Sequence, residues 1–325
     1  MFKAGTKIPH PYNDIRKIVT VFQNPPPFKA LHPRYWPVWL GIAILRIMVF
    51  LPFRIQFATG ASLGRLLYRY GRRRRHIASV NLALCFPDLS DAEREKILVQ
   101  HFESLGIALF EAGLAWWASN KRLEKLVSGI SGLEHVRAAL ASGRGVIMLT
   151  AHFTCLEIGG RLFGIYLPFQ ALYRTHENPA LQYLIQKYRN MHLGKAIPRE
   201  NIRAMLKTLK DGKAVWYLQD QNFGHKNKVF VPFFGVEAAT TPATSRMARF
   251  SNAVVIPCFA RRNEDYSGYQ LTILPPLDDF PGEDDVQDTA RIARIIEQEV
   301  RKSPAQYLWS HRRFKDRPEG QDSFY

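Results

Sequence analysis

A histidine and a glutamate five positions apart are the residues of this chain whose types and spacing best suit acid–base chemistry. His152 comes just after the apolar run Val146–Thr150, and Glu157 completes an H-x4-E arrangement. The run predicts a buried strand, so His152 would lie in a strand-to-helix loop and Glu157 on the first helical turn. From there the carboxylate can hold one imidazole nitrogen, which fixes the tautomer and raises the basicity of the other nitrogen, as a general base requires.

The spacing by itself is a weak signal, because a histidine and a glutamate five apart often occur by chance. An ordinary polar loop leading into a helix is the alternative interpretation. If both residues belonged to one helix, about 100° of rotation per residue would place them roughly 140° apart. The hypothesis of a His152–Glu157 dyad therefore depends on the loop position of His152.

Short apolar runs alternate with helical patterns over the rest of the chain. The predicted strands are Val146–Thr150, Gln170–Tyr173, Ala214–Leu218, Val254–Phe259 and Leu271–Leu274. Helices are expected near 156–165, 178–192, 201–211, 242–251 and 285–302, and Ser90 with Glu93 predicts a capping box at the start of another helix. This alternation predicts an α/β fold with a mainly parallel sheet flanked by helices, whose chemistry gathers at the carboxyl ends of the strands.

The charge of the chain is concentrated near its amino terminus. Its 325 residues carry 45 Lys and Arg against 28 Asp and Glu, a formal +17. Residues 1–76 hold 14 bases and a single acid, hence +13, which leaves +4 for the other 249 residues. A nucleic-acid-binding domain would spread a basic face over its folded body, so this distribution argues against nucleic acid and favours a localised anionic partner.

The segment Trp36–Phe53 predicts an amino-terminal hydrophobic membrane helix. Fourteen of its 18 residues are apolar, and as one helix it would be about 27 Å long, close to the thickness of a hydrocarbon core. Because of Arg46 the segment fits either a single marginal span or a deeply embedded interfacial helix, and six arginines between 65 and 75 suit anionic lipid headgroups. A buried core helix followed by a solvated basic turn is the alternative. We predict a basic arm at 1–33, a membrane anchor with its basic flank at 34–76, and a catalytic domain at 77–325.

The cysteine content and the first residues bear on the compartment. Three widely spaced cysteines, Cys85, Cys155 and Cys258, fit neither a zinc site nor a disulfide framework, so reduced thiols facing the cytosol are expected. The first 30 residues show no signal-peptide pattern. No metal and no cofactor are predicted.

Several sequence blocks occur in an order that is informative in combination. They are HPRYWPVWLG at 32–41, NLALCFPDLS at 81–90, HFTCLEIGGR at 152–161, YR at 173–174, QDQNFG at 219–224, VFVPFFG at 229–235, VIPCFARR at 255–262 and WSHRRFKDRPEG at 309–320. Together they resemble the late acyltransferases of lipid A biosynthesis, over about nine-tenths of the chain. The stretch FESLGIALFEAGLAWW and the ending HRRFKDRPEG look most like the lauroyl-transferring branch.

The resemblance implies a glycerolipid acyltransferase-like fold in the inner membrane of a Gram-negative bacterium, with the active site facing the cytoplasm. The enzyme would transfer a fatty acyl chain from acyl carrier protein to the 3-hydroxyl of a hydroxyacyl chain on a Kdo-bearing lipid A precursor. His152 would be the general base and Glu157 its orienting partner, with direct transfer and no acyl-enzyme. Cys155 lies within the motif and is interpreted as a packing residue.

Four further residues are assigned to substrate binding. Arg174 ends a predicted strand, matches a second family block and would hold a phosphate or the developing oxyanion. Asp220 matches an acidic position after another strand and would order the active-site loops through hydrogen bonds. Lys226 and Lys228 lie in a loop where an anionic substrate or the acidic carrier protein could dock, although a solvated loop is an equal alternative.

Two other functions remain open from the sequence. A glycerolipid or lysophospholipid acyltransferase shares the H-x4-acid arrangement of a histidine and an acid five positions apart, but usually has Asp in the second position and a different order of blocks. A membrane-tethered nucleic-acid-binding or scaffold protein is the non-enzyme alternative, and the charge distribution argues against it.

Overall fold

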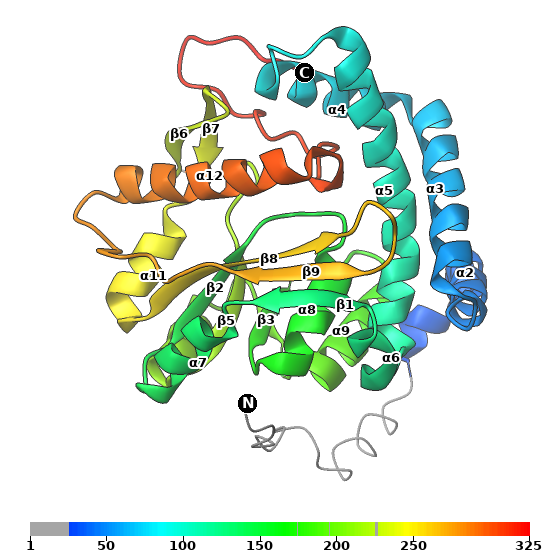
Figure 1. The fold of residues 1–325 in the computed structure, drawn as a ribbon, viewed down its shortest axis with the longest axis horizontal. Coiled ribbons are helices and arrows are strands. Elements are labelled where there is room, and N and C mark those ends of the chain that lie inside the picture. The colour runs from blue at the N-terminus through cyan, green and yellow to red at the C-terminus, as the bar shows by residue number, and fades with distance from the viewer. Residues whose placement is uncertain (1–25, 174, 195, 225–226) are drawn as a thin grey trace, which may run out of the picture.

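A seven-stranded sheet runs through the centre of the protein (Figure 1) in the computed structural model, which describes residues 26–173, 175–194, 196–224 and 227–325. The strand order is β1-β9-β8-β2-β5-β3-β4, and every neighbouring pair is parallel except β8 and β9. The strands are β1 Val127–Ser131, β2 Val146–Thr150, β3 Gln170–Tyr173, β4 Ile197–Pro198, β5 Ala214–Leu218, β8 Val254–Arg262 and β9 Tyr269–Ile273. The predicted mainly parallel α/β sheet is confirmed.

The central strand β2 is apolar because it is covered on both faces. All five of its residues are buried, and it pairs with β5 on one side and with β8 on the other. A strand enclosed in this way reads as a continuous apolar run in the sequence, without the alternation of a half-exposed strand. All five predicted strands match β2, β3, β5, β8 and β9 to within a few residues.

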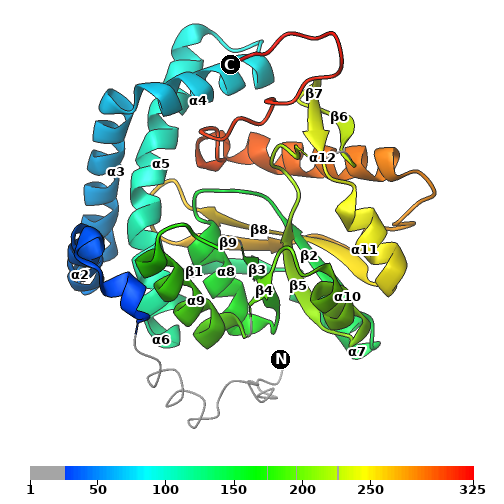
Figure 2. The same ribbon diagram turned by 180° about the vertical axis from the view of Figure 1, so that it is seen from behind.

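Seven helices that follow α5 in the chain surround the sheet, and α12 runs alongside β8 and β9 (Figures 1 and 2). These helices are α6 Asn120–Glu124, α7 Leu133–Ala141, α8 Leu156–Tyr166, α9 Pro179–Leu193, α10 Ile202–Lys210, α11 Ala243–Ser251 and α12 Asp285–Lys302. The five predicted helices match α8 to α12. An antiparallel hairpin of β6 Val229–Phe233 and β7 Val236–Thr240 packs against α12 and was not predicted as strands.

Two long helices, α3 Phe53–Tyr70 and α5 Asp91–Trp117, run side by side along one edge of the molecule (Figures 1 and 2). Helix α5 begins at the predicted capping box of Ser90 and Glu93. Glycines allow the two backbones to touch, since a Cβ on Gly106 would lie 2.0 Å from the carbonyl oxygen of Gly60. Among the described residues α5 is the helix long and apolar enough to cross a membrane, but more than half of its most apolar window is buried, as in a core helix.

The predicted single membrane helix over Trp36–Phe53 is wrong in its extent. Helix α2 covers Trp36–Met48 and ends in a turn before α3 begins at Phe53. Pro52 explains the break, because it lacks an N–H and disfavours helical geometry in the residue before it. The Gln56 amide then donates to the freed carbonyl oxygens of Val49 and Leu51, at 3.3 and 2.7 Å. Thirteen residues give a helix of about 20 Å, too short to span a bilayer upright.

Helix α4, Arg72–Cys85, joins this edge to the carboxyl-terminal segment, which ends beside it (Figure 1). The buried Asn81 amide donates to the backbone oxygens of Trp309 and His311, at 2.6 and 2.7 Å. Arg74 donates to the oxygen of Ser310 at 3.0 Å. Part of the arginine cluster therefore lies against the last segment of the chain.

Candidate active site

His152 and Asp220 meet where two adjacent strands end. Strands β2 and β5 pair in parallel with Thr150 opposite Leu218, so His152 and Asp220 each follow their strand at the same offset. His152 Nδ1 lies 2.7 Å from Asp220 Oδ1, and the backbone N–H of His152 donates to Oδ2 at 2.8 Å. One carboxylate thus holds both the ring and the main chain of the histidine.

The environment keeps Asp220 ionised. Only 2% of its side chain is exposed, against 26% for His152. Burial raises the pKa of Asp220, but the charge and hydrogen bonds of His152, together with nearby Arg313, lower it to about 2. An anionic acceptor on Nδ1 places the ring proton there, which leaves the Nε2 lone pair free to accept a proton.

The loop that carries His152 is hydrogen-bonded to residues 306–308, near the carboxyl terminus. The backbone N–H of Leu308 donates to the oxygen of His152 at 2.9 Å, and that of Thr154 donates to the oxygen of Gln306 at 2.7 Å. Phe153 and Tyr307 form an antiparallel bridge between these contacts. Residues far apart in the sequence therefore fix the position of the imidazole.

The predicted contact between Glu157 and His152 is not what the structure shows. Glu157 lies on the first turn of α8, and its carboxylate turns toward α5 and α9. It accepts from Arg189 Nη2 at 2.5 Å and Nε at 3.3 Å, and from the Trp116 indole at 3.2 Å. Burial raises the pKa of Glu157, and the guanidinium lowers it below its usual value. Asp220 takes the position expected of Glu157 because the strand pairing brings it to the imidazole.

Arg189 is a site residue that the sequence did not reveal. It lies on α9 next to Tyr188, whose ring stacks on that of Trp116 with centroids 6.0 Å apart and whose hydroxyl accepts from Trp117 at 2.6 Å. This aromatic cluster excludes water from part of the Glu157–Arg189 pair, in which about a quarter of each side chain is exposed. A helix start held in this way gives the His152 loop a rigid support.

Cys155 lies inside the motif but faces the core. Its side chain is fully buried, its thiol donates to the backbone oxygen of Ala260 at 3.2 Å, and burial raises its pKa to about 12. A thiol in this state is not a nucleophile. Within the described residues, no three metal-ligating side chains converge.

The remaining predicted substrate-binding residues are only partly placed. Arg174 and Lys226 lie outside the described residues. Lys228 donates to Asp316 at 2.8 Å, and about a quarter of its side chain is exposed. The backbone N–H of Asp316 in turn donates to Asn222, two residues after Asp220, at 3.0 Å. The structure therefore links Lys228 to the active-site loop through a neighbouring carboxylate.

Comparison with known proteins assigns the family. Residues 27–316 match the family described as bacterial lipid A biosynthesis acyltransferase. The chain belongs to that family. It is 42% identical over 306 residues to the lipid A biosynthesis lauroyltransferase of Escherichia coli (strain K12), covering 93% of this chain and 99% of that protein. It is also 42% identical to the palmitoleoyltransferase of the same organism, covering 91% and 96%.

This lipid A biosynthesis acyltransferase has a more remote structural neighbour as well. The 1-acyl-sn-glycerophosphate acyltransferase of Thermotoga maritima matches with a TM-score of 0.36 and 12% identity, covering 72% of this chain and 98% of that one. The likeness is too distant to inform the site. The family membership identifies the protein as an O-acyltransferase of lipid A biosynthesis.

Proposed function

We propose that the enzyme transfers a lauroyl chain from acyl carrier protein to the 3-hydroxyl of a hydroxyacyl chain on a Kdo-bearing lipid A precursor. The family supports acyl transfer in lipid A biosynthesis, and the lauroyl-transferring relative supports the chain length. The palmitoleoyl-transferring relative has the same 42% identity to this chain. A test of chain length therefore needs donors with several acyl chains.

The His152–Asp220 pair is the observation that carries the mechanism. Asp220 holds the proton on Nδ1 of His152, and Nε2 has no hydrogen-bond partner among the described residues. A hydroxyl within reach of Nε2 can therefore transfer its proton to His152 as its oxygen attacks. The imidazolium that forms lies against an ionised, buried carboxylate, which stabilises it.

The transfer then proceeds in two steps. The acceptor oxygen bonds to the thioester carbonyl carbon, its proton moves to His152 Nε2, and the carbonyl π electrons move to the oxygen. When this tetrahedral intermediate collapses, the C=O bond reforms and the C–S bond breaks. The thiolate of the carrier leaves and takes the proton from Nε2, which returns His152 to its starting state. Buried Cys155 supports direct transfer without an acyl-enzyme, since its thiol neither ionises nor faces solvent.

Glu157 keeps a place in this mechanism as a positioning residue. Through Arg189 and Trp116 it fixes the first turn of α8, and that turn directly follows the His152 loop. Anion binding remains assigned to Arg174, with Lys226 and Lys228 near the docking site of the carrier. The ammonium group of Lys228 already forms an ion pair with Asp316, so we expect Lys228 to contribute little to docking of the carrier.

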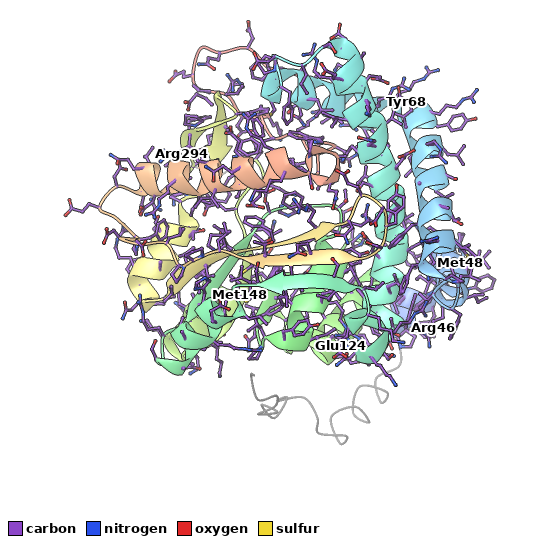
Figure 3. All side chains as sticks on the ribbon, viewed as in Figure 1. Arg46, Met48, Tyr68, Glu124, Met148 and Arg294 are labelled. Atoms are coloured by element: carbon purple, nitrogen blue, oxygen red, sulfur yellow. The ribbon has the colours of Figure 1, made fainter. Side chains whose placement is uncertain are left out.

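An exposed apolar surface on α2 and α3 supports attachment to a membrane. Its α2 members recur at helical spacing, and all are at least half exposed: Trp36, Leu40, Ile44 and Ile47. On α3 it continues through Leu63, Leu66, Leu67 and Tyr70. The labelled Arg46 and Tyr68 in Figure 3 mark the two ends of this edge. Such a patch beside the Arg72–Arg75 cluster suits insertion into the interface of an anionic membrane, parallel to its plane.

We infer that this apolar surface holds the enzyme on the cytoplasmic face of the bacterial inner membrane. There the acceptor lipid and a cytosolic acyl carrier protein can both reach His152. The basic arm at 1–33 and the segment 34–76 would together form the anchor, while 77–325 forms the catalytic domain. Of the two anchors that the sequence allows, the pair of short helices favours the interfacial one over the spanning one.

Purified enzyme in anionic vesicles tests the proposed function. The donors are acyl carrier proteins loaded with 12-, 14- or 16-carbon chains, and the acceptors are a Kdo-bearing lipid A precursor or a lysophospholipid. Mass spectrometry should show one added 12-carbon chain on the lipid A precursor, and H152A should abolish it. Acylation of the lysophospholipid alone would favour the glycerolipid alternative. Binding of nucleic acid without any transfer would favour the scaffold alternative.

A further inference from the structure

A second imidazole, that of His311, is held by the same loop as His152. The backbone N–H of Asn222 donates to His311 Nε2 at 3.1 Å, two residues after Asp220 contacts His152. The two histidines are 159 positions apart in the sequence, yet one short stretch, Asp220–Asn222, fixes both rings. His311 is partly exposed, as His152 is.

The contact with Asn222 determines the tautomer of His311. A backbone N–H can only donate, so Nε2 of His311 must carry a lone pair, and its ring proton lies on Nδ1. Burial lowers the pKa of His311 to about 4; nearby Asp220 opposes this shift, and the charges of Arg313 and Arg74 add to it. The ring is therefore neutral at physiological pH. Its Nδ1–H has no partner among the described residues.

The two imidazoles thus have complementary roles available to them. His152 offers a lone pair on Nε2, while His311 offers an N–H on Nδ1. The other usual donors near a developing oxyanion are the backbone N–H groups that follow the base. Here those of His152, Phe153, Thr154 and Leu156 already donate within the protein. Four of the five N–H groups from His152 to Leu156 are therefore committed within the protein, so a side-chain donor adds to what this loop can offer.

We propose that His311 is a catalytic residue whose Nδ1–H donates a hydrogen bond to the thioester carbonyl oxygen and stabilises the oxyanion of the tetrahedral intermediate. The proposal rests on the acyl transfer proposed above. While His152 takes the proton of the attacking hydroxyl, His311 keeps its own proton and only binds the negative oxygen. The bond strengthens as charge develops, so it lowers the barrier more than it tightens substrate binding.

The main chain at His311 is held by hydrogen bonds as well. Its backbone oxygen accepts from buried Asn81 at 2.7 Å, and Arg74 donates to the oxygen of the preceding Ser310 at 3.0 Å. Helix α4 therefore holds the main chain while Asn222 holds the ring. A donor fixed at both ends needs little reorganisation during the reaction.

Steady-state kinetics on H311A and H311N in anionic vesicles test the proposal. H311A removes both ring nitrogens, and we expect kcat to fall about 10²- to 10³-fold with little change in KM for either substrate. H311N restores an N–H near the Nδ1 position but leaves Asn222 without its acceptor. It should recover at least about tenfold of the lost kcat. H135A, a replacement of a partly exposed histidine on α7, serves as the matched control and should behave as the wild type.

The outcomes separate the two proposals. A kcat for H311A within about threefold of the wild type would overturn the role of His311. So would an H311N that is as slow as H311A, because the residue would then act only through Asn222. If H311A fails to fold, H311N decides the matter, since only a donor role predicts substantial turnover in it. An inactive wild-type enzyme with every donor and acceptor would instead refute the proposed function itself.

Discussion

Asp220 accepts two hydrogen bonds from His152, one from the ring at 2.7 Å and one from the main chain at 2.8 Å, across 68 positions of sequence. Both oxygens of the buried carboxylate are therefore used by a single residue. The arrangement fixes the ring proton on Nδ1 and the orientation of the imidazole at the same time. It is possible only because β2 and β5 are neighbours in the sheet and end at the same level.

The double contact predicts a severe loss of activity in D220N. An asparagine has one oxygen and one NH2 group, so it cannot accept from both the backbone N–H and Nδ1–H. If its oxygen takes the main-chain bond, its NH2 faces Nδ1 and forces the ring proton onto Nε2, where the base is needed. We expect kcat to fall about 10³- to 10⁴-fold, as is usual when a catalytic histidine has the wrong tautomer. Initial rates with the acyl carrier protein thioester as donor measure this fall in kcat.

Asp211 offers the control for this substitution. It follows α10 at the surface, and its side chain forms ion pairs with the exposed Lys207 and Lys213. D211N should keep wild-type kcat and stability. A D220N enzyme that retains more than about a tenth of wild-type kcat would show that Asp220 does not set the tautomer of His152.

The Glu157–Arg189 pair predicts a different outcome for E157Q. Removing this carboxylate leaves the Arg189 guanidinium largely buried without its counter-charge, and that is costly. Since the pair is about a quarter exposed, we expect a loss of about 1–3 kcal/mol in the free energy of unfolding. The imidazole keeps its Asp220 contacts, so kcat should fall much less than in D220N. Urea unfolding and initial rates on the same preparations compare the two effects.

E157Q and D220N together decide which carboxylate is the partner of His152. If E157Q were the slower enzyme at equal stability, the dyad expected from the H-x4-E spacing would be correct in function despite the observed geometry. If D220N is the slower one, the partner is the residue that the sheet brings to the ring.

Some strands and helix ends could be predicted from the sequence and others could not, depending on how their burial patterns the residues. The run Val146–Thr150 was predicted because a fully enclosed strand leaves an uninterrupted apolar signature. Strand β1, Val127–Ser131, contains polar residues, glycine and partly exposed positions, and it left no such signal. The turn at Pro52 was missed because apolar composition continues through it and hid the end of the helix.

Which of the predicted site residues touch one another could not be read from their order in the sequence. His152 and Asp220 were both singled out, but Glu157 was assigned to the imidazole because it is nearest in sequence. The true partner depends on the pairing of β2 with β5, which no local pattern encodes. Arg189 and His311 were missed for the same reason, since their contacts reach Glu157 across 32 positions and Asn222 across 89.

A buried histidine on α5 predicts acid sensitivity. His101 is fully buried, and burial lowers its pKa from 6.5 to about 4. Between these values the unfolded chain binds the proton and the folded protein does not, so the free energy of unfolding falls as the pH is lowered from 6.5 toward 4. The contribution of neutral His101 to the free energy of unfolding is fully present above pH 6.5 and is on the order of 3 kcal/mol. Chemical unfolding at a series of pH values measures it.

H101Q separates this residue from the other titrating groups. The substitution lowers stability at neutral pH, but it should flatten the decline between pH 6.5 and 4 by comparison with the wild type. Parallel curves for the two proteins would mean that His101 does not cause the acid sensitivity.

The apolar surface of α2 predicts how the protein partitions to membranes. Ile44 and Ile47 are 53% and 67% exposed, and removing an isoleucine from water contributes on the order of 2 kcal/mol. The I44S/I47S variant should therefore bind vesicles of phosphatidylglycerol and phosphatidylcholine at least about tenfold more weakly in a flotation assay. I202S/V286S, which replaces two exposed apolar residues away from this surface, should float like the wild type. Equal losses in both variants would mean that α2 is not the membrane contact.

The buried ion pair of Arg262 and Glu111 predicts the largest effect on stability. Arg262 donates to Glu111 through Nε at 2.7 Å and Nη2 at 2.9 Å, and 3% and 1% of the two side chains are exposed. The Tyr269 hydroxyl also donates to Glu111, at 2.6 Å, and Arg262 donates to Ser104, which contacts Thr154 of the His152 loop at 2.7 Å.

R262M removes the cation and leaves the Glu111 carboxylate buried without a counter-charge. We expect it to lower the free energy of unfolding by about 3–5 kcal/mol. E111L/R262M removes both charges, and it should regain much of that loss, because an apolar pair avoids the cost of burying charge. The recovery should be incomplete since the Tyr269 hydroxyl loses its acceptor. Urea unfolding of both variants measures the difference. A double variant no more stable than R262M would show that the pair itself, and not an unpaired carboxylate, sets the stability of this region.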